Sequence, residues 1–283
     1  MKCNKVIIYD DNCPLCSLYT IGFVAAGMIT NDNRKNFSTV DSSLLELIDT
    51  NRCRNEIPVI DLKNSQVWYG IEGLSEIIQQ RLPFLKPVID FRPVNWILNK
   101  TYNLISYNRR VIVARKTTVG NFDCTPDFNF RYRLLFMLLF IAFNTFMLYP
   151  IQINILANSS IRINQNELQA LHFMLVISNI AIAYFLHPRV AIEFLGQVNM
   201  LALTTVLLTI PLIFLNKFCF ADLFINNYYL SLLTLFVFVE YRRRMDYAGI
   251  IKNYPIIVVL NILALLVFII CLFNKINFHP PLF

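Results

Sequence analysis

The sequence predicts a small thioredoxin-like α/β domain at the N-terminus, followed by an all-α bundle of five membrane-spanning helices. Two observations predict this combination. A short apolar run, Val6 to Asp10, leads into the pair Cys13-Pro14-Leu15-Cys16 and then into the apolar stretch Leu18 to Ile29. The chain is 56% hydrophobic and 15% charged, and the apolar excess is concentrated after Arg133. We expect the α/β domain over 1–85.

The spacing of Cys13 and Cys16 indicates thiol–disulfide chemistry. A strand, a two-cysteine turn and a helix in that order form the redox corner of a thioredoxin-like fold. A cysteine at a helix N-terminus meets unpaired N–H groups and the positive end of the helix dipole, which favour the thiolate. Cys13 is therefore the expected nucleophile, and Cys16, one turn later, resolves the mixed disulfide. Asp10 is a candidate proton shuttle for Cys16.

Two other interpretations of the cysteine pair stay open at this point. A CxxC pair forms half of many zinc sites, but zinc needs two more ligands. The chain has no second CxxC and no HxxxH, its other five cysteines are scattered, and its three histidines are far apart in the sequence. The pair could also be an inert remnant. We expect no metal and no cofactor.

The rest of the α/β domain is assigned from local signals. The stretch Leu18 to Ile29 is too short to cross a membrane and fits a buried core helix. The cysteine motif interrupts the N-terminal region, so no signal peptide is expected. Phe37 to Val40 is a candidate strand, and Ser42 to Asp49 is a candidate helix with Asp41 or Ser42 as its cap. Further strands are expected over 57–61 and 67–69, with a helix over 72–80.

Three stretches of this sequence carry a family resemblance. They are Tyr9 to Cys16, Val67 to Gly70 and Tyr102 to Arg109. The first resembles the opening motif of the DCC family of predicted thiol–disulfide oxidoreductases, the DUF393 domain, and the other two are similar to its last strand and its closing segment. The resemblance covers about residues 4–115. It implies a thioredoxin-like fold in which Pro58 takes the place of a cis-proline that faces the dithiol and shapes the substrate groove.

Asp11 departs from the family pattern, which has glycine at this position. If the position needs a positive φ, aspartate is less favourable there than glycine. A second carboxylate near Cys13 would also raise the pKa of that thiol by like-charge repulsion. Both effects would lower the reactivity of the pair.

Five stretches of the second half reach the length of a membrane span. None contains Lys, Arg, Asp or Glu, and all are apolar around the whole helix rather than on one face. The five are Leu134–Leu156, Leu168–Leu186, Phe194–Leu215, Leu223–Val239 and Tyr254–Phe273. We therefore expect a bundle over 134–283, integral to the cell (inner) membrane.

Basic residues near the span ends predict the orientation of the bundle. One set would be cytoplasmic with the N-terminus inside: Arg115, Lys116, Arg131, Arg133, Arg189, Arg242, Arg243, Arg244 and Lys252. The smaller set would lie outside: Arg162, Lys217 and Lys275. This asymmetry places the N-terminus in the cytoplasm and the C-terminus outside. It also explains the net charge of +7, so no nucleic acid is expected as a partner.

Residues 86–133 form the expected linker, with two interpretations left open. Trp96, Tyr102 and Tyr107 alternate with aliphatic residues, and Arg109-Arg110 follows. The segment is either an interfacial helix on the inner leaflet or a helix that packs on the α/β domain. Both arrangements keep the dithiol close to the membrane surface.

Polar residues inside the spans are expected to join helices by hydrogen bonds. They are Asn144, Asn154, Ser178, Asn179, Asn199, Thr204, Thr205 and Asn261, with His172 near one span end. Cys219 and Cys271 are both expected near the outer surface. They could pair as a disulfide there, form a second dithiol in an electron relay across the membrane, or serve as small packing residues.

Three functions are compatible with these observations. The leading one is a membrane-anchored oxidoreductase that exchanges disulfides with thiol-containing protein partners. The alternative is a structural subunit whose α/β domain docks other membrane proteins of a complex. A transporter or channel is disfavoured, because no charged residue lies mid-span and no internal repeat is visible.

Overall fold

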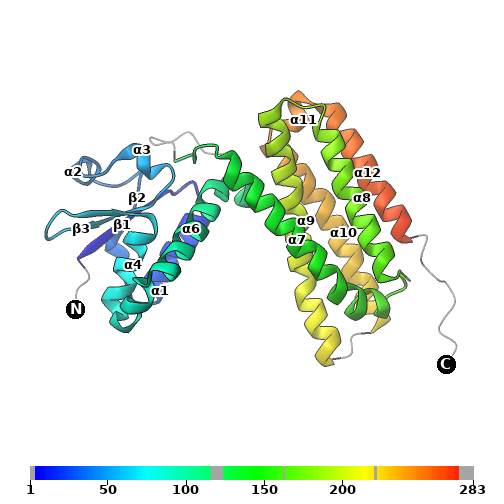
Figure 1. Cartoon of the computed structure of the whole chain (residues 1–283), viewed down its shortest axis with the longest axis horizontal. Coiled ribbons are helices and arrows are strands. Elements are labelled where there is room, and N and C mark those ends of the chain that lie inside the picture. The colour runs from blue at the N-terminus through cyan, green and yellow to red at the C-terminus, as the bar shows by residue number, and fades with distance from the viewer. Residues whose placement is uncertain (1–3, 116–123, 162, 220–221, 274–283) are drawn as a thin grey trace. The chain divides into compact units, whose positions relative to one another are not determined.

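The computed structural model describes residues 4–115, 124–161, 163–219 and 222–273 of the 283-residue chain. The chain divides into two compact units, Met1–Leu135 (unit 1) and Phe136–Phe283 (unit 2) (Figure 1). Unit 1 holds the sheet of the molecule together with short helices. Unit 2 consists mainly of long helices.

The sheet of unit 1 has four strands and is mixed. They are β1 (Lys5–Tyr9), β2 (Arg34–Asn36), β3 (Pro58–Asp61) and β4 (Val67–Tyr69). Their spatial order is β2-β1-β3-β4. β1 is parallel to β2 and antiparallel to β3, and β3 is antiparallel to β4. Three residues separate the end of β1 from Cys13, so the cysteine pair lies beyond the C-terminal end of this inner strand.

Helices cover both faces of this sheet (Figure 1). One face carries α1 (Pro14–Ala25) and α4 (Gly70–Arg81), against which α6 (Arg92–Val113) packs. The other face carries α2 (Ser42–Leu45) and α3 (Thr50–Cys53). Three short elements complete the unit: η1 (Asn31–Asn33), η2 (Pro83–Leu85) and α5 (Lys86–Ile89). The alternation of strand residues therefore builds two hydrophobic cores, one on each face.

The two cores have different neighbours. Ile7 and Val59 are fully buried on the α1 side, in the same cluster as the cysteine pair. Ile8 and Ile60 are fully buried on the opposite side, in a cluster with Cys53. The dithiol is thus in contact with the core that α1 and α4 share.

Most predicted strands are confirmed, but the second strand and the helix after it are displaced. β2 ends at Asn36, and Phe37 beyond it fills the core with 7% of its surface exposed. The helix expected over 42–49 is wrong beyond α2, because Asp49 caps α3 instead. The Asp49 carboxylate accepts the N–H groups of Asn51 and Arg52, so a new helix begins there.

The expectation of a buried core helix over Leu18 to Ile29 is confirmed only in part. α1 ends at Ala25, and Gly27 follows with a φ of +65°. Cys16 and Thr20 are buried in α1, whereas Leu18 is 68% and Ile21 51% exposed. Only one face of the helix covers the sheet, and the apolar run continues onto the other face.

Replacing Gly73 in α4 by alanine is expected to destabilise unit 1 by about 1–3 kcal/mol. A Cβ at this position would lie 2.8 Å from Cγ2 of Val59, which is fully buried in the core. Helix α4 would have to move away from the sheet to make room. The measurement is the urea concentration at which the buried Cys53 of the full-length protein becomes alkylated.

Gly22→Ala in α1 is the matched control for this prediction. A Cβ at Gly22 would meet nothing within 4 Å, and alanine favours a helix over glycine by about 1 kcal/mol. The alkylation midpoint of Cys53 should therefore stay unchanged or rise. Equal losses in both variants would contradict a close approach of α4 to the sheet.

Unit 2 is a helical bundle. Its elements are α7 (Phe130–Asn154), which begins in unit 1, then η3 (Leu156–Asn158), α8 (Gln165–Ala183), α9 (Pro188–Cys219), α10 (Leu223–Tyr247), α11 (Ile250–Asn253) and α12 (Pro255–Phe273). Within the described residues, four helices are long and apolar enough to cross a membrane. They run over Phe130–Asn158, Pro188–Phe218, Leu223–Tyr247 and Pro255–Leu272. Each of the four carries several large apolar side chains on its exposed surface, as expected for helices that face lipid.

α8 differs from these four helices. It corresponds to the predicted span Leu168–Leu186, but its first turn carries Gln165, Asn166 and Glu167, so its apolar part is short. Its polar start is a capping box, in which Asn164 and Glu167 bond each other's backbone N–H groups. α8 packs against α9 and α12 within unit 2.

Some of the in-span polar residues join helices as predicted. Asn261 of α12 donates to Asn179 of α8, and both are buried. Asn199 of α9 donates to the carbonyl of Met137 in α7. Among the described residues, other members bond only within their own helix: Asn154, Ser178, Thr204 and Thr205. For these residues the interhelical prediction is wrong, because short side chains reach the carbonyl three or four residues earlier.

The Cys219 side chain lies outside the described residues, and so does the pairing with Cys271 that was considered for it. Cys271 is a half-buried free thiol. Of the basic residues that predicted the orientation, Lys116, Arg162 and Lys275 also lie outside the described residues. His172 is in α8, and its ring contacts the ring of the adjacent residue Phe173, with 5.6 Å between the centroids.

Candidate functional site

Cys13 is the N-cap of α1, as the sequence predicted. Its backbone is extended, with φ −106° and ψ 102°, and Pro14 follows as the first helical residue. Proline suits this position because its missing N–H would have no partner in the first turn. The backbone N–H of Cys16 donates to Sγ of Cys13 at 3.4 Å. The sulfur of Cys13 therefore takes the place of the oxygen that usually caps a helix.

The surroundings of the two thiols shift their pKa values in opposite directions. Both side chains are buried, with 3% of Cys13 and 4% of Cys16 exposed. A hydrogen bond from the thiol of Cys16 lowers the pKa of Cys13 to about 6, although burial opposes this shift. The same hydrogen bond, reinforced by burial, raises the pKa of Cys16 far above its ordinary value. At neutral pH Cys13 is the thiolate and Cys16 holds the proton.

Arg109 of α6 lies directly beside the pair. Its Nη1 donates to Sγ of Cys16 at 3.7 Å, and only 6% of the residue is exposed. Its Nη2 donates to the carbonyl of Arg54 at 2.6 Å and to the carbonyl of Cys124. The guanidinium contributes to the lowered pKa of Cys13 because its positive charge favours the thiolate. The sequence did not predict a role for Arg109 at the site.

Arg109 belongs to a row of anchors along one face of α6. Tyr102, Ser106 and Arg109 are spaced at i, i+4 and i+7, which places them on one side of a helix. Tyr102 accepts the N–H of Ile57 at 2.9 Å through its hydroxyl oxygen, and Ser106 donates to the carbonyl of Asn55. The row fastens residues 54–57, the segment that leads into β3, next to the dithiol. The i, i+4, i+7 spacing in the sequence indicates that the three residues share a helix face, but not which segment that face contacts.

Asp10 lies at the end of β1, beside the dithiol. It is 4% exposed, and its Oδ1 accepts the N–H of Asn12 at 2.9 Å. Its Oδ2 makes no hydrogen bond with any described residue. Burial raises the pKa of the carboxyl, while Arg109 and Arg110 oppose the rise. A buried carboxyl with a free oxygen and a raised pKa has the properties of a proton carrier.

Comparison of the chain with protein-family models, with curated proteins and with solved structures finds no match. The chemistry of the site is therefore inferred from its own geometry. That geometry combines a buried sulfur pair of unequal acidity, a guanidinium next to it, and a carboxyl with one unbonded oxygen.

Pro58 is not placed as the resemblance implied. No peptide bond among the described residues is cis, so the bond between Ile57 and Pro58 is trans. Pro58 is buried at the start of β3 and pairs with Tyr69. Its neighbours Ile57 and Val59 belong to the cluster of the two cysteines, and strand alternation directs Pro58 to the other face. The segment before β3 borders the site through Ile57.

Asp11 does not act as the family comparison suggested. Its φ is not positive, since Ser65 and Ala114 are the non-glycine residues with positive φ in the described chain. The interpretation that aspartate is strained there is therefore wrong. Its carboxylate accepts the hydroxyl of Ser38 at 2.6 Å, and its charge acts on Asp10, whose pKa it raises. Asp11 therefore adds to the effect of burial on the Asp10 carboxyl.

Two further thiols among the described residues of unit 1, Cys53 and Cys124, differ from the pair. Burial raises the pKa of Cys53 to about 12 and also raises the pKa of Cys124. Both lie in the cluster on the opposite face of the sheet and are unreactive at neutral pH. Among the residues that the structure describes, no three His, Cys, Asp or Glu side chains gather as ligands for a metal ion.

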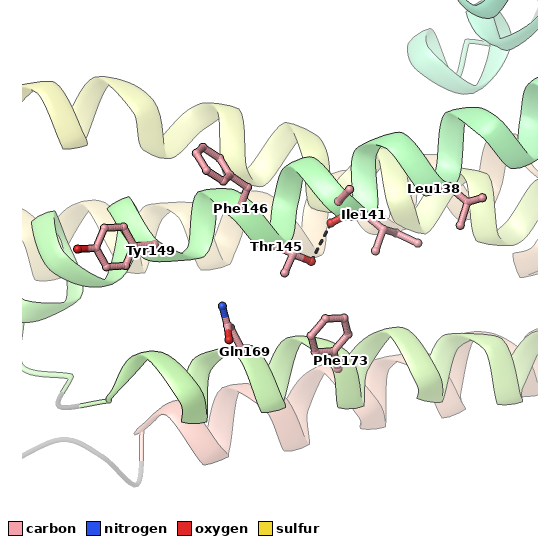
Figure 2. A pocket seen from close by; sticks show the side chains of 8 residues that line it. Leu138, Ile141, Thr145, Phe146, Tyr149, Gln169 and Phe173 are labelled. Carbon is pink, nitrogen blue, oxygen red and sulfur yellow. Dashed lines mark hydrogen bonds between the residues drawn. The ribbon is translucent and has the colours of Figure 1, made fainter.

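Unit 2 contains a groove of about 600 Å³ between α7 and α8. Figure 2 shows Gln169 and Phe173 of α8 directed toward α7 across this space. The lining is Leu138, Ile141, Ala142, Thr145, Phe146, Tyr149, Gln169 and Phe173. It includes no acid, base or thiol suited to catalysis.

Proposed function

We propose that this chain is a membrane-anchored thiol–disulfide oxidoreductase whose unit 1 is a thioredoxin-like domain of the DCC type. The observation that carries the proposal is the low pKa of Cys13 beside the protonated thiol of Cys16. The succession of strand, CxxC and helix, with β2 parallel to β1 and helices on both faces of the sheet, supports the fold.

The first half of the reaction uses the Cys13 thiolate. It attacks one sulfur of a disulfide in the partner protein, and the partner's S–S bond breaks as the new bond to Cys13 forms. The second partner sulfur leaves as a thiolate and takes a proton from water. The guanidinium of Arg109 favours the negative charge on the attacking sulfur and stays protonated throughout.

The second half uses Cys16 and Asp10. Cys16 loses its proton to the carboxylate of Asp10 and attacks Sγ of Cys13 in the mixed disulfide. The partner's remaining sulfur leaves as a thiolate, and a Cys13–Cys16 disulfide forms. The partner disulfide gains two electrons and the dithiol loses two, and the same steps run in reverse oxidise a partner dithiol.

The alkylation rate of Cys13 is expected to rise with pH around a midpoint near 6. An ordinary cysteine thiol has its midpoint near 9.0. Because the pKa of the folded protein is lowered, the thiolate is present above pH 6 and is lost as pH falls through 6. Mass spectrometry of the Cys13 peptide after brief iodoacetamide treatment of the full-length protein measures this profile. Urea-unfolded protein is the control, and a folded midpoint near 9 would overturn the proposal.

For unit 2 we propose five spans, with α8 as the fifth. Asn179 of α8 is buried against Asn261 of α12, and α12 is one of the four helices long and apolar enough to cross a bilayer. The two helices pack along each other, so α8 lies at a depth similar to that of α12. The distribution of basic residues supports a cytoplasmic unit 1 and an outer C-terminus.

A further inference from the structure

Unit 1 carries an unpartnered apolar surface away from its two cores. We call it the aromatic patch, and it consists of the exposed residues Phe84 (69%), Val88 (53%), Phe91 (60%), Trp96 (63%) and Ile97 (54%). They belong to η2, α5 and the start of α6, which pack on one another. Exposed aromatic residues gathered on consecutive elements indicate a surface that something else covers.

Basic residues surround the aromatic patch. Arg81, Lys86, Arg92 and Lys100 are all exposed, and none forms an ion pair within the described part of the chain. Asp90 is the acidic residue of this segment, and it accepts a hydrogen bond from Gln79. Trp96, Arg92 and Lys100 are spaced four residues apart, so they follow one line along α6. The surface therefore combines aromatic side chains with a positive rim.

The sequence left open whether the segment after residue 86 packs on the α/β domain or lies on a membrane surface, and the two halves of α6 differ in this respect. Its C-terminal half packs within unit 1, where Ser106, Asn108 and Arg109 are buried. Its N-terminal half leaves Trp96 and Ile97 exposed. One helix therefore connects the aromatic patch to the guanidinium beside the dithiol.

We propose that the aromatic patch inserts into the interface of an anionic lipid bilayer, the same bilayer that unit 2 crosses. Tryptophan and phenylalanine favour the interfacial zone, and basic residues around them are attracted to acidic headgroups. Unit 1 is joined to the spanning helices by its own chain, so the membrane surface is present at high effective concentration. The inference depends on unit 2 lying in a bilayer and is independent of the chemistry of Cys13.

The test measures where Trp96 lies in the full-length protein. The protein is reconstituted into vesicles of brominated phosphatidylcholine with phosphatidylglycerol, because bromine quenches only tryptophan that reaches the acyl chains. The chain has two tryptophans, so the difference between wild type and Trp96→Phe isolates Trp96 from Trp68. We expect most of the Trp96 emission to be lost, relative to unbrominated vesicles, and the Trp68 emission to be retained.

Charge reversal at the rim provides the second arm. The double variant Arg92→Glu and Lys100→Glu should lower the quenching of Trp96 several-fold, as should vesicles without phosphatidylglycerol. Quenching of Trp96 by aqueous iodide in place of bromine would show that the patch lies in water and would overturn the proposal. Quenching by neither would show that protein covers it, either unit 2 or a second copy, and would overturn it as well.

Discussion

Cys16→Ser is expected to leave Cys13 covalently bound to its partner proteins. The variant keeps a hydroxyl that can donate to the Cys13 thiolate, so attack on a partner disulfide still proceeds. Serine cannot form the second disulfide, and the mixed disulfide therefore persists. Non-reducing electrophoresis of membranes that contain the full-length variant should show new high-mass species. Reductant should abolish them, and mass spectrometry of the released chains identifies the partners.

Two variants control this result. Cys13→Ser combined with Cys16→Ser should yield none of the adducts, because the attacking sulfur is missing. Cys53→Ser should behave as wild type, since the Cys53 thiol is buried and its pKa is raised to about 12. If Cys16→Ser traps no protein and the double variant keeps full function in cells, unit 1 is a docking platform and not an enzyme.

The dithiol could be predicted from the sequence because everything that creates it is local. β1, the turn and α1 follow one another within residues 5–25, so the order of residues alone places Cys13 at the helix N-terminus. The position of Asp10 next to the dithiol could be predicted for the same reason. The pKa difference between the thiols also arises locally, from the hydrogen bond between them.

Arg109 could not be assigned from local pattern. It is 93 residues from Cys16, and it reaches the site only because α6 packs across α1 and α4. Its motif neighbours Tyr102 and Ser106 showed a helical spacing, but the segment that they hold, residues 54–57, is distant in sequence as well. Such pairings depend on tertiary packing, which no local propensity encodes.

The spans were predicted from the apolar content of each stretch, and four of the five correspond to helices long and apolar enough to cross a membrane. The prediction was least accurate at the ends of the helices. α10 continues to Tyr247, beyond the predicted end at Val239, and includes Arg244, which pairs with Glu240 at 2.8 Å and donates to Gln197 of α9. A charged residue whose partners lie on the same and a neighbouring helix can be buried within a helix. A span that is predicted to stop at the first charged residue therefore ends before the helix does.

Arg109→Leu is expected to raise the pKa of Cys13 and to destabilise unit 1. The substitution removes the positive charge beside the sulfur pair, so the midpoint of Cys13 alkylation should move upward from about 6. It also removes the donor to the carbonyls of Arg54 and Cys124, and a buried carbonyl without a partner costs about 1–3 kcal/mol. Alkylation of the buried Cys53 in urea measures this loss.

Arg109→Lys separates the two roles, because lysine keeps the charge but lacks the planar fork that bonds two carbonyls at once. If the charge acts on Cys13, the lysine variant should keep an alkylation midpoint close to that of wild type while unit 1 still unfolds at lower urea. A merely structural Arg109 would give the opposite pattern, in which both variants lose stability and neither shifts the pH profile of Cys13. The guanidinium would then be only a clamp for residues 54–57, and the electrostatic part of the proposed mechanism would rest on the hydrogen bond from Cys16 alone.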